Sequence, residues 1–301
     1  MSKSIADAKG RSPEQSQIRK DTGITARLKK LADPSAWPAL LPGAQRVSST
    51  PEEREAYIHE VRHEIQGWNG TGAFHLVHEI AKHQLKLGVR GDIAEIGVHH
   101  GQMLVFLMMM LRSGERAIAI DLFDEQHLNI DRSGHGDRDV FNENVERYVP
   151  SLSGELTVIQ GDSTCLKPAD LFGDKGQGVR LFSVDGGHTR DIVINDLFLA
   201  AAGLNDAGVV ILDDVFNAYF PGVGDGLSAY ISGGADLSRY SSYRNSNRRL
   251  APFAIGCNKV MLAFEPHRKK YMDFLLECPI ANTIRGHAIG WGVDGIPVFE
   301  L

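Results

Sequence analysis

The chain has 301 residues, of which 43% are hydrophobic, enough for one large buried core with decorated ends. Its formal net charge is −6, from 38 acidic and 32 basic side chains. This balance argues against nucleic acid as the main partner, because nucleic-acid binders usually carry a basic surface, and it favours a small or neutral molecule.

Cysteine usage and the apolar runs bear on where the protein resides. Cys165, Cys257 and Cys278 are widely spaced and odd in number, so they indicate neither a disulfide framework nor a paired-CxxC zinc site. The N-terminus has no apolar signal core, and the longest apolar run, residues 103–111, is far below the roughly 20 residues of a membrane-spanning helix. We therefore expect a cytoplasmic protein that enters no membrane.

The chain begins irregularly and then becomes periodic. Residues 1–48 show no clean periodicity, whereas Thr50, Pro51 and Glu53 form a capping box that predicts a helix over residues 51–66. From residue 72, helical patterns alternate with short apolar strands, which is typical of a parallel sheet covered on both faces. The expected strands are 91–96, 116–121, 156–160, 179–184 and 208–213, and the expected helices are 73–87, 101–113, 137–148 and 190–203.

The rest of the chain completes the predicted fold. Apolar runs on either side of Cys257 and Asn258 predict a closing antiparallel hairpin, followed by a helix over 267–277. The helix over 101–113 is apolar nearly all round, so it needs cover from the N-terminal extension or from a second subunit of a homo-oligomer. We expect a doubly wound, Rossmann-like α/β fold with a mostly parallel seven-stranded sheet. The expected parts are a partly helical extension (1–70), a catalytic domain (71–265) and a C-terminal helix and extension (266–301).

Ligands of open α/β sheets bind beyond the carboxyl ends of the strands, and polar residues follow each strand here. Gly97 and Gly101 follow the first strand and let the backbone approach a ligand at the start of a helix. Asp121 comes about 20 residues after that loop, where an acid can bind both hydroxyls of a ribose. Asp162 and Ser163 can read an adenine edge, although such a tripeptide also occurs in ordinary turns. The GxxxG form of the loop disfavours a dinucleotide.

Carboxylates also follow the fourth and fifth strands. These strands should be neighbours, about 4.8 Å apart, so that Asp185, Asp213 and Asp214 converge. Three carboxylates repel each other unless a cation lies among them, and hard oxygen ligands suit magnesium, manganese or calcium. His188, three residues after Asp185, could serve as a general base beside such a metal. Alternatively, these residues only end strands and cap turns.

Five motifs, EIGVHHG, AIAIDLFDEQ, VIQGDS, SVDGGHTRDIVINDLFLA and GVVILDDVFN, occur in order within residues 90–265. Together they resemble the class I S-adenosylmethionine-dependent methyltransferases, and most of all the metal-dependent O-methyltransferases that act on sugar hydroxyls of macrolides. The cofactor-binding residues that this resemblance implies are Glu95, Gly97, Gly101, Asp121, Asp162 and Ser163. The implied ligands of a divalent metal, expected to be magnesium, are Asp185, Asp213 and Asp214, with His188 as the base.

This chain departs from the catechol-type branch of the family at two positions, and these departures point away from a catechol as the acceptor molecule. In the catechol-type branch the last metal ligand is usually asparagine and the base position lysine, whereas this chain has Asp214 and His188. Residues 219–250 could fold over the acceptor or form an ordinary surface excursion. We expect transfer of a methyl group from S-adenosylmethionine to a hydroxyl of a small molecule, such as a sugar or other natural product. The alternatives are a non-methylating reaction at the same sites and a non-catalytic binding or assembly protein.

Overall fold

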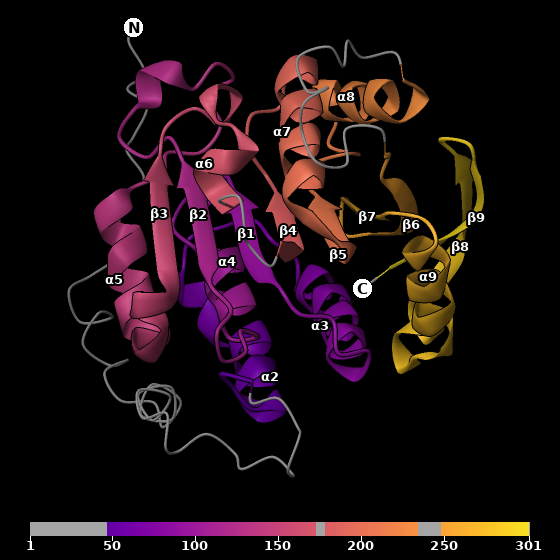
Figure 1. Ribbon diagram of the computed structural model, residues 1–301, viewed down its shortest axis with the longest axis horizontal. Helices are drawn as coiled ribbons and strands as arrows, with labels where there is room; N and C mark the ends of the chain where they lie inside the picture. Colours follow the sequence, from indigo (N-terminus) through magenta and orange to yellow (C-terminus); the bar gives the residue numbers. More distant parts are fainter. Residues whose placement is uncertain (1–46, 173–177, 234–247, 301) are drawn as a thin grey trace, which may run out of the picture.

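The structure, a computed structural model, has a mixed sheet of nine strands within the residues that it describes, 47–172, 178–233 and 248–300. The strands are β1 (Asp92–Ile96), β2 (Ala117–Asp121), β3 (Leu156–Gln160), β4 (Val179–Val184), β5 (Leu204–Leu212), β6 (Ala251–Gly256), β7 (Lys259–Ala263), β8 (Ile284–Gly290) and β9 (Val293–Phe299). Their order is β3-β2-β1-β4-β5-β7-β6-β9-β8, and Figure 1 shows them side by side.

The first five strands are parallel, and their order reverses at β1, which lies between β2 and β4. This switch point brings the carboxyl ends of β1, β4 and β5 together. β7 pairs antiparallel with both β5 and β6, which confirms the closing hairpin. The doubly wound α/β fold was therefore predicted correctly.

The predicted count of seven strands is wrong, because β8 and β9 extend the sheet beyond β6. β9 pairs with β6 in parallel and with β8 antiparallel, so residues expected to form only a C-terminal extension belong to the same sheet. β8 is a half-exposed edge strand in which exposed and partly buried residues alternate. Such a strand lacks the apolar run that marks a buried strand in a sequence.

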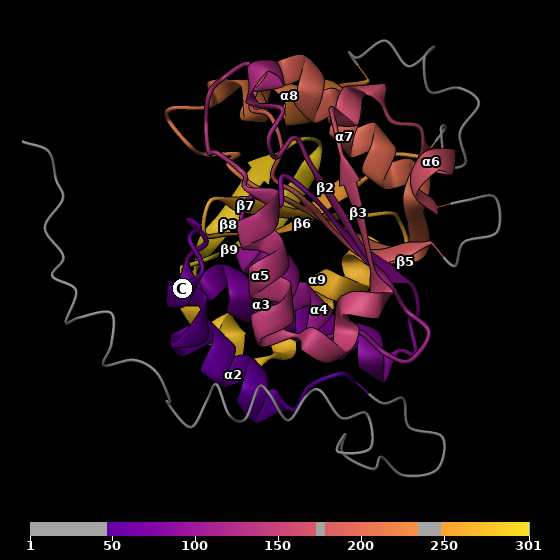
Figure 2. The ribbon, with the colours of Figure 1, turned by 90° about the vertical axis from the view of Figure 1, so that its left-hand side faces the viewer.

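Helices cover both faces of the sheet. They are α2 (Pro51–His59), α3 (Thr71–Lys86), α4 (Gln102–Met108), α5 (Arg138–Tyr148), α6 (Pro168–Phe172), α7 (Arg190–Gly203), α8 (Pro221–Ser232) and α9 (His267–Glu277). Figure 2 shows α3, α4, α5 and α9 on one face and α6, α7 and α8 on the other. Successive strand residues alternate between two cores: Ile93 packs into the first and Ala94 into the second. Among the described helices, none is both long and apolar enough to cross a membrane.

The helix expected over residues 51–66 is too long. The Thr50 capping box is confirmed, but α2 ends at His59 and Val61–Glu64 form a 3-10 helix. The Nε of Arg62 donates to the carbonyl of Ile58 at 2.7 Å, which satisfies one of the carbonyls that a helix end leaves open. Local hydrogen bonding thus ends the helix although the apolar spacing continues.

The helix expected over residues 101–113 is also shorter, because α4 ends at Met108. The hydroxyls of Ser48 and Ser49 donate to the carbonyls of Met108 and Met109, and Arg180 donates to the carbonyl of Met110. These carbonyls lie at the helix end, where partners from outside the helix must satisfy them. Tertiary contacts therefore decide where α4 stops.

The apolar α4 is covered within one chain. Tyr57 of α2 donates from its hydroxyl to the carbonyl of Gln102, and its ring stacks on Phe106 with centroids 5.7 Å apart. Phe74 of α3 meets Phe106 edge-on at 5.1 Å. The residues before the catalytic motifs thus provide the cover that the sequence demanded, and a homo-oligomer stays a prediction.

A buried ion cluster joins the end of α4 to β4. Glu115 has a fully buried side chain and pairs with Arg112 at 2.7 Å and Arg180 at 3.1 Å, both 2% exposed. Removing one member of a buried ion pair leaves its partner uncompensated, which is strongly destabilising. Glu115 therefore compensates the charges of two buried guanidinium groups, whose burial would otherwise be strongly unfavourable.

We predict that Glu115→Gln lowers the free energy of unfolding by about 3–5 kcal/mol, the usual cost of breaking a buried pair. Urea unfolding followed by circular dichroism measures it. The matched control is Glu300→Gln, which breaks the exposed Arg285–Glu300 pair and should cost less than about 1 kcal/mol. Equal losses for the two variants would contradict the assigned role of the cluster.

Candidate active site

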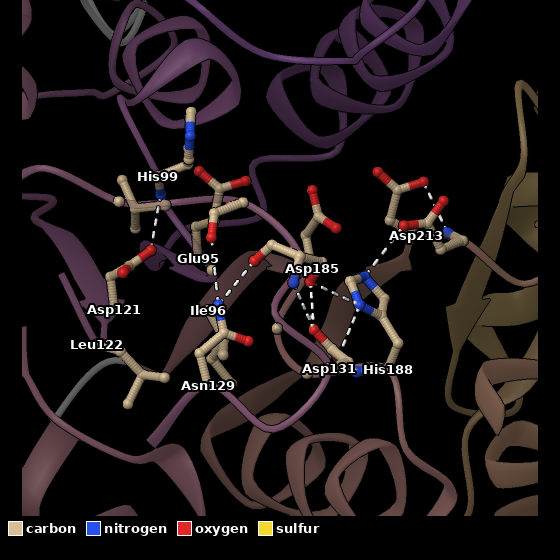
Figure 3. A pocket seen from close by; sticks show the side chains of 18 of the residues that line it. Glu95, Ile96, His99, Asp121, Leu122, Asn129, Asp131, Asp185, His188 and Asp213 are labelled. Carbon is tan, nitrogen blue, oxygen red and sulfur yellow. Dashed lines mark hydrogen bonds and ion pairs between the residues drawn. The ribbon is translucent and has the colours of Figure 1, made fainter. Parts of the chain in front are cut away.

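A cavity of about 570 Å³ opens where the carboxyl ends of the parallel strands meet. Its volume lies within the range of about 300–1,000 Å³ common for small-molecule sites. The loops after β1, β2, β3, β4 and β5 contribute to its wall, as do residues 66–70 and the turn between β6 and β7. All of the predicted site residues line the cavity except Gly101. Figure 3 shows several of them together.

The two glycines after β1 have different structural roles. Gly97 has φ +80°, and a Cβ there would lie 1.7 Å from the carbonyl oxygen of Asp185. Only glycine therefore lets the loops after β1 and β4 cross so closely. Gly101 has φ +90° at the start of α4, and a Cβ there would lie 2.8 Å from the ring of Phe141. Its glycine requirement follows from this packing, outside the lining of the cavity.

Within the described part of the chain, Glu95 presents to the cavity one carboxylate oxygen without a hydrogen-bond partner. Its side chain is buried, with 2% of the residue exposed, and its Oε2 has no hydrogen-bond partner among the described residues. Burial, followed by the negative charge of Asp185, raises the pKa of Glu95 well above its usual value. A carboxylate placed in this way favours a cationic partner from a ligand. The ammonium group at the amino-acid end of S-adenosylmethionine has the required charge.

Asp121 and Asp162 are fixed by the backbone around them. Asp121 Oδ2 accepts from the amide of His99 at 2.7 Å, and its Oδ1 accepts from the amide of Phe123 at 2.6 Å. Burial raises the pKa of Asp121. Asp162 Oδ1 accepts from the amide of Thr164 at 2.8 Å. Each carboxylate keeps further lone pairs, so both can still accept hydrogen bonds from a ligand.

The three predicted metal ligands divide into two groups. Ligand atoms of Asp185, His188 and Asp214 lie within 4.8 Å of one another. Asp214 Oδ2 lies 3.1 Å from His188 Nε2, whereas Asp213 Oδ2 forms an ion pair with Lys259 Nζ. Burial alone would raise the pKa of Asp214, but hydrogen bonds, first from His188, lower it below its usual value. The carboxylates converge as expected, with a protein cation already among them.

Lys259 is a site residue that the sequence analysis missed. It is the first residue of β7, it is 2% exposed, and it faces the carboxylates of Asp213, Asp185 and Glu95. Burial would lower its pKa, but the charges of Asp213 and Asp185 raise it above the usual value, so the ammonium stays charged. Even so, burial and Asp213 raise the pKa of Asp185 well above its usual value. A lysine opening an otherwise apolar strand was the available signal.

Asp131, in the loop between β2 and α5, orients the histidine. Its Oδ2 lies 3.0 Å from His188 Nδ1 and also accepts from the backbone amide of His188 at 2.8 Å. Phe220 stacks on the imidazole with centroids 3.8 Å apart. Burial would lower the pKa of His188, but the hydrogen bond with Asp214 and the charge of Asp131 raise it. Figure 3 shows Asp131 beside His188. No sequence signal marked Asp131, because its loop has no periodicity.

Comparisons with known proteins place this site in context. The structure of the O-methyltransferase NovP is similar to the chain, with 15% sequence identity, a TM-score of 0.47 and coverage of 63% of this chain and 78% of that chain. The TDP-rhamnose 3′-O-methyltransferase CalS11 of calicheamicin biosynthesis is similar with 16% identity, a TM-score of 0.45 and coverage of 85% of this chain and 96% of that chain. The methyltransferase MycE, in complex with Mg, SAH and mycinamycin VI, is similar with 14% identity, a TM-score of 0.43 and coverage of 70% of this chain and 53% of that chain. No curated protein matches the chain. Residues 94–215, which contain the loops after β1, β2, β3 and β4, match the family model of a methyltransferase domain. The chain is therefore similar to methyltransferase domains over the residues that carry these loops.

Proposed function

We propose that this protein is an O-methyltransferase that transfers the methyl group of S-adenosylmethionine to a hydroxyl of a small molecule, with the help of a divalent cation. One observation carries the proposal: a single cavity holds both Glu95, whose Oε2 has no hydrogen-bond partner among the residues that the structure describes, and the group formed by Asp185, His188 and Asp214. The first supports a site for the ammonium of the cofactor. The second supports a site where a hydroxyl loses its proton.

Three acids along the cavity support the position of the cofactor. Glu95 would accept from its ammonium, Asp121 from its ribose hydroxyls and Asp162, with Ser163, from its adenine. Asp121 and Asp162 are already held by backbone amides, so neither has to be ordered when the ligand binds. The order of these acids follows the order of β1, β2 and β3 across the sheet.

The carboxylates at the ends of β4 and β5 suit a hard cation. Magnesium usually takes one or two protein carboxylates and keeps several waters, so Asp185 and Asp214 would be sufficient ligands. Asp213 is held by Lys259, which is buried and charged, and it would become a third ligand only by giving up that pair. The donor set therefore fits magnesium or manganese with two carboxylates, one fewer than the sequence motifs imply.

When bound, S-adenosylmethionine would supply an electrophilic methyl group and the divalent cation would favour the deprotonated form of the acceptor hydroxyl. In this structure His188 donates from Nε2 to Asp214, so it would accept the hydroxyl proton at Nε2 only when Asp214 serves instead as a cation ligand and Nε2 has given up its own proton. Asp131 would hold the proton on Nδ1, so that Nε2 is the nitrogen that accepts. The methyl group would replace the hydroxyl proton, which His188 would hold, and the cofactor would become the neutral thioether S-adenosylhomocysteine.

The mouth of the cavity suits an acceptor with an apolar body. Trp68 is 73% exposed and Ile130 is 71% exposed, and both line the cavity together with Leu128. Exposed apolar side chains at a cavity mouth often contact ligands. A sugar or another hydroxyl-bearing natural product with an apolar portion would use both the polar floor and this mouth.

Cofactor binding provides the first test. S-adenosylhomocysteine should raise the melting temperature of the wild-type chain, since a ligand of the folded state stabilises it. Glu95→Gln should weaken binding about 10- to 100-fold by isothermal titration calorimetry, because hydrogen bonds to charged groups contribute about 1.5–3 kcal/mol. Glu146→Gln, an exposed change on α5, should leave affinity unchanged. A response to a nicotinamide dinucleotide instead of S-adenosylhomocysteine would overturn the cofactor assignment.

The role of His188 is tested by single-turnover kinetics. His188→Ala should lower the rate of methyl transfer about 100- to 10,000-fold, the usual contribution of a general base, and leave the affinity for S-adenosylhomocysteine unchanged. His287→Ala removes an exposed histidine of β8 and should have no effect. An undiminished rate in His188→Ala would show that the histidine only supports the loop after β4.

Metal dependence is tested by chelation. Exhaustive chelation should abolish turnover, and magnesium or manganese should restore it in the wild-type chain but not in Asp185→Asn or Asp214→Asn. Mass spectrometry of the product should show a gain of about 14 mass units, as replacement of hydrogen by methyl requires. Full activity after chelation would make the cluster structural, and a different mass change would favour a non-methylating reaction.

A further inference from the structure

A second group of metal-ligating side chains lies where α2 packs against α3. One ligand atom from each of Glu55, His59 and His75 lies within 4.8 Å of the other two. None of the three residues lines the cavity. Among the described residues, this is the one such group besides the active-site group.

Two helices bring these side chains together. Glu55 and His59 are four residues apart on α2, so they lie on the same face of the helix. His75 lies in the first turns of α3, and its ring centroid is 5.3 Å from that of His59. Edge-on packing of Tyr57 against Phe74, with centroids 6.1 Å apart, fixes the two helices relative to each other. The group therefore rests on rigid elements.

The separations suit a small tetrahedral ion. His59 Nε2 and Glu55 Oε2 are 3.5 Å apart. Two ligands of a tetrahedral zinc ion, with bonds of about 2.0–2.1 Å, lie about 3.4 Å apart. This pair is therefore already spaced for chelation, and rotation of the partly exposed His75 side chain would close the site.

His78 of α3 lies beside the other oxygen of the carboxylate. Arg54 Nε donates to His78 Nε2 at 3.0 Å, so His78 Nδ1 carries the proton, and it points to Glu55 Oε1 at 3.6 Å. His78 thus lies on the Oε1 side of Glu55, beyond hydrogen-bond distance, and Oε2 is the oxygen that lies near His59.

We propose that Glu55, His59 and His75 form a site for a divalent transition-metal ion, zinc by preference, with water completing the coordination. Two imidazoles and one carboxylate favour zinc, nickel or copper over magnesium, which prefers oxygen ligands throughout. The ion would link His59, the last residue of α2, to His75 of α3. It would thereby tie together the two ends of the segment between these helices. That segment contains residues 66–70, which line the cavity. The inference does not depend on methyl transfer.

Zinc titration of the full chain tests the proposal in a shared His188→Ala background, which removes the imidazole of the cavity group, with saturating magnesium present to occupy the remaining carboxylates. Competition with a chromophoric chelator should give one zinc per chain that magnesium does not displace. His59→Ala and His75→Ala should each weaken that binding more than about tenfold, since even losing a group that only supports a ligand costs about 10- to 100-fold. The matched control is His63→Ala, an exposed histidine outside the group, and it should bind zinc as the His188→Ala parent does.

Circular dichroism establishes that each variant is folded, and S-adenosylhomocysteine affinity reports separately on the active site. Zinc binding that is equally strong in His59→Ala, His75→Ala and the His188→Ala parent would overturn the proposal. The absence of any bound zinc in that parent would also overturn it. Neither result would bear on the proposed methyl transfer.

Discussion

The active site is governed by negative charge buried at one edge of the sheet. Glu95, Asp185, Asp213 and Asp214 follow or end three adjacent parallel strands, and partial burial makes their mutual repulsion stronger than in water. Lys259 offsets part of this charge from within the protein. The remaining excess must be met by protonation or by cations from ligands. A sulfonium cofactor with an ammonium group and a divalent cation are two such ligands.

The fold places these groups through a few close approaches. Gly97 lets the loop after β1 touch the backbone of Asp185, and the pairing of β7 with β5 carries Lys259 to Asp213. Asp131 links the loop after β2 to His188, so it joins the Asp121 side of the cavity to the Asp214 side. Each approach depends on neighbouring strands, which explains why residues distant in sequence make one site. Helices on both faces keep the strand ends in register.

The sequence predicted those parts of the site whose positions follow from strand order alone. Asp185 and Asp214 were expected together because β4 and β5 must be neighbours, and the structure brings both to His188. Lys259 and Asp131 were missed for different reasons. Lys259 depends on the antiparallel return of β7, whose register no local pattern gives. Asp131 lies in an irregular loop, where only tertiary contacts show what a side chain meets.

Element ends and edge strands were predicted less well for the same reason. The ends of α2 and α4 are set by Arg62 and by Ser48 and Ser49, which capture carbonyls from outside the helical pattern. β8 was missed because a half-exposed edge strand has little apolar content. The predicted helix end at residue 203 agrees with α7, which lies fully within one layer. Residues 234–247, part of the segment expected to fold over the acceptor, lie outside the described residues.

Excess buried charge would select both the cofactor and the cation. A crystal structure with S-adenosylhomocysteine and manganese, recorded with anomalous scattering, would show whether each lies beside the carboxylates. We expect the ammonium within hydrogen-bond distance of Glu95 and an anomalous peak between Asp185 and Asp214, with Lys259 still paired with Asp213. An ammonium away from Glu95, or no manganese at the ends of β4 and β5, would contradict this expectation.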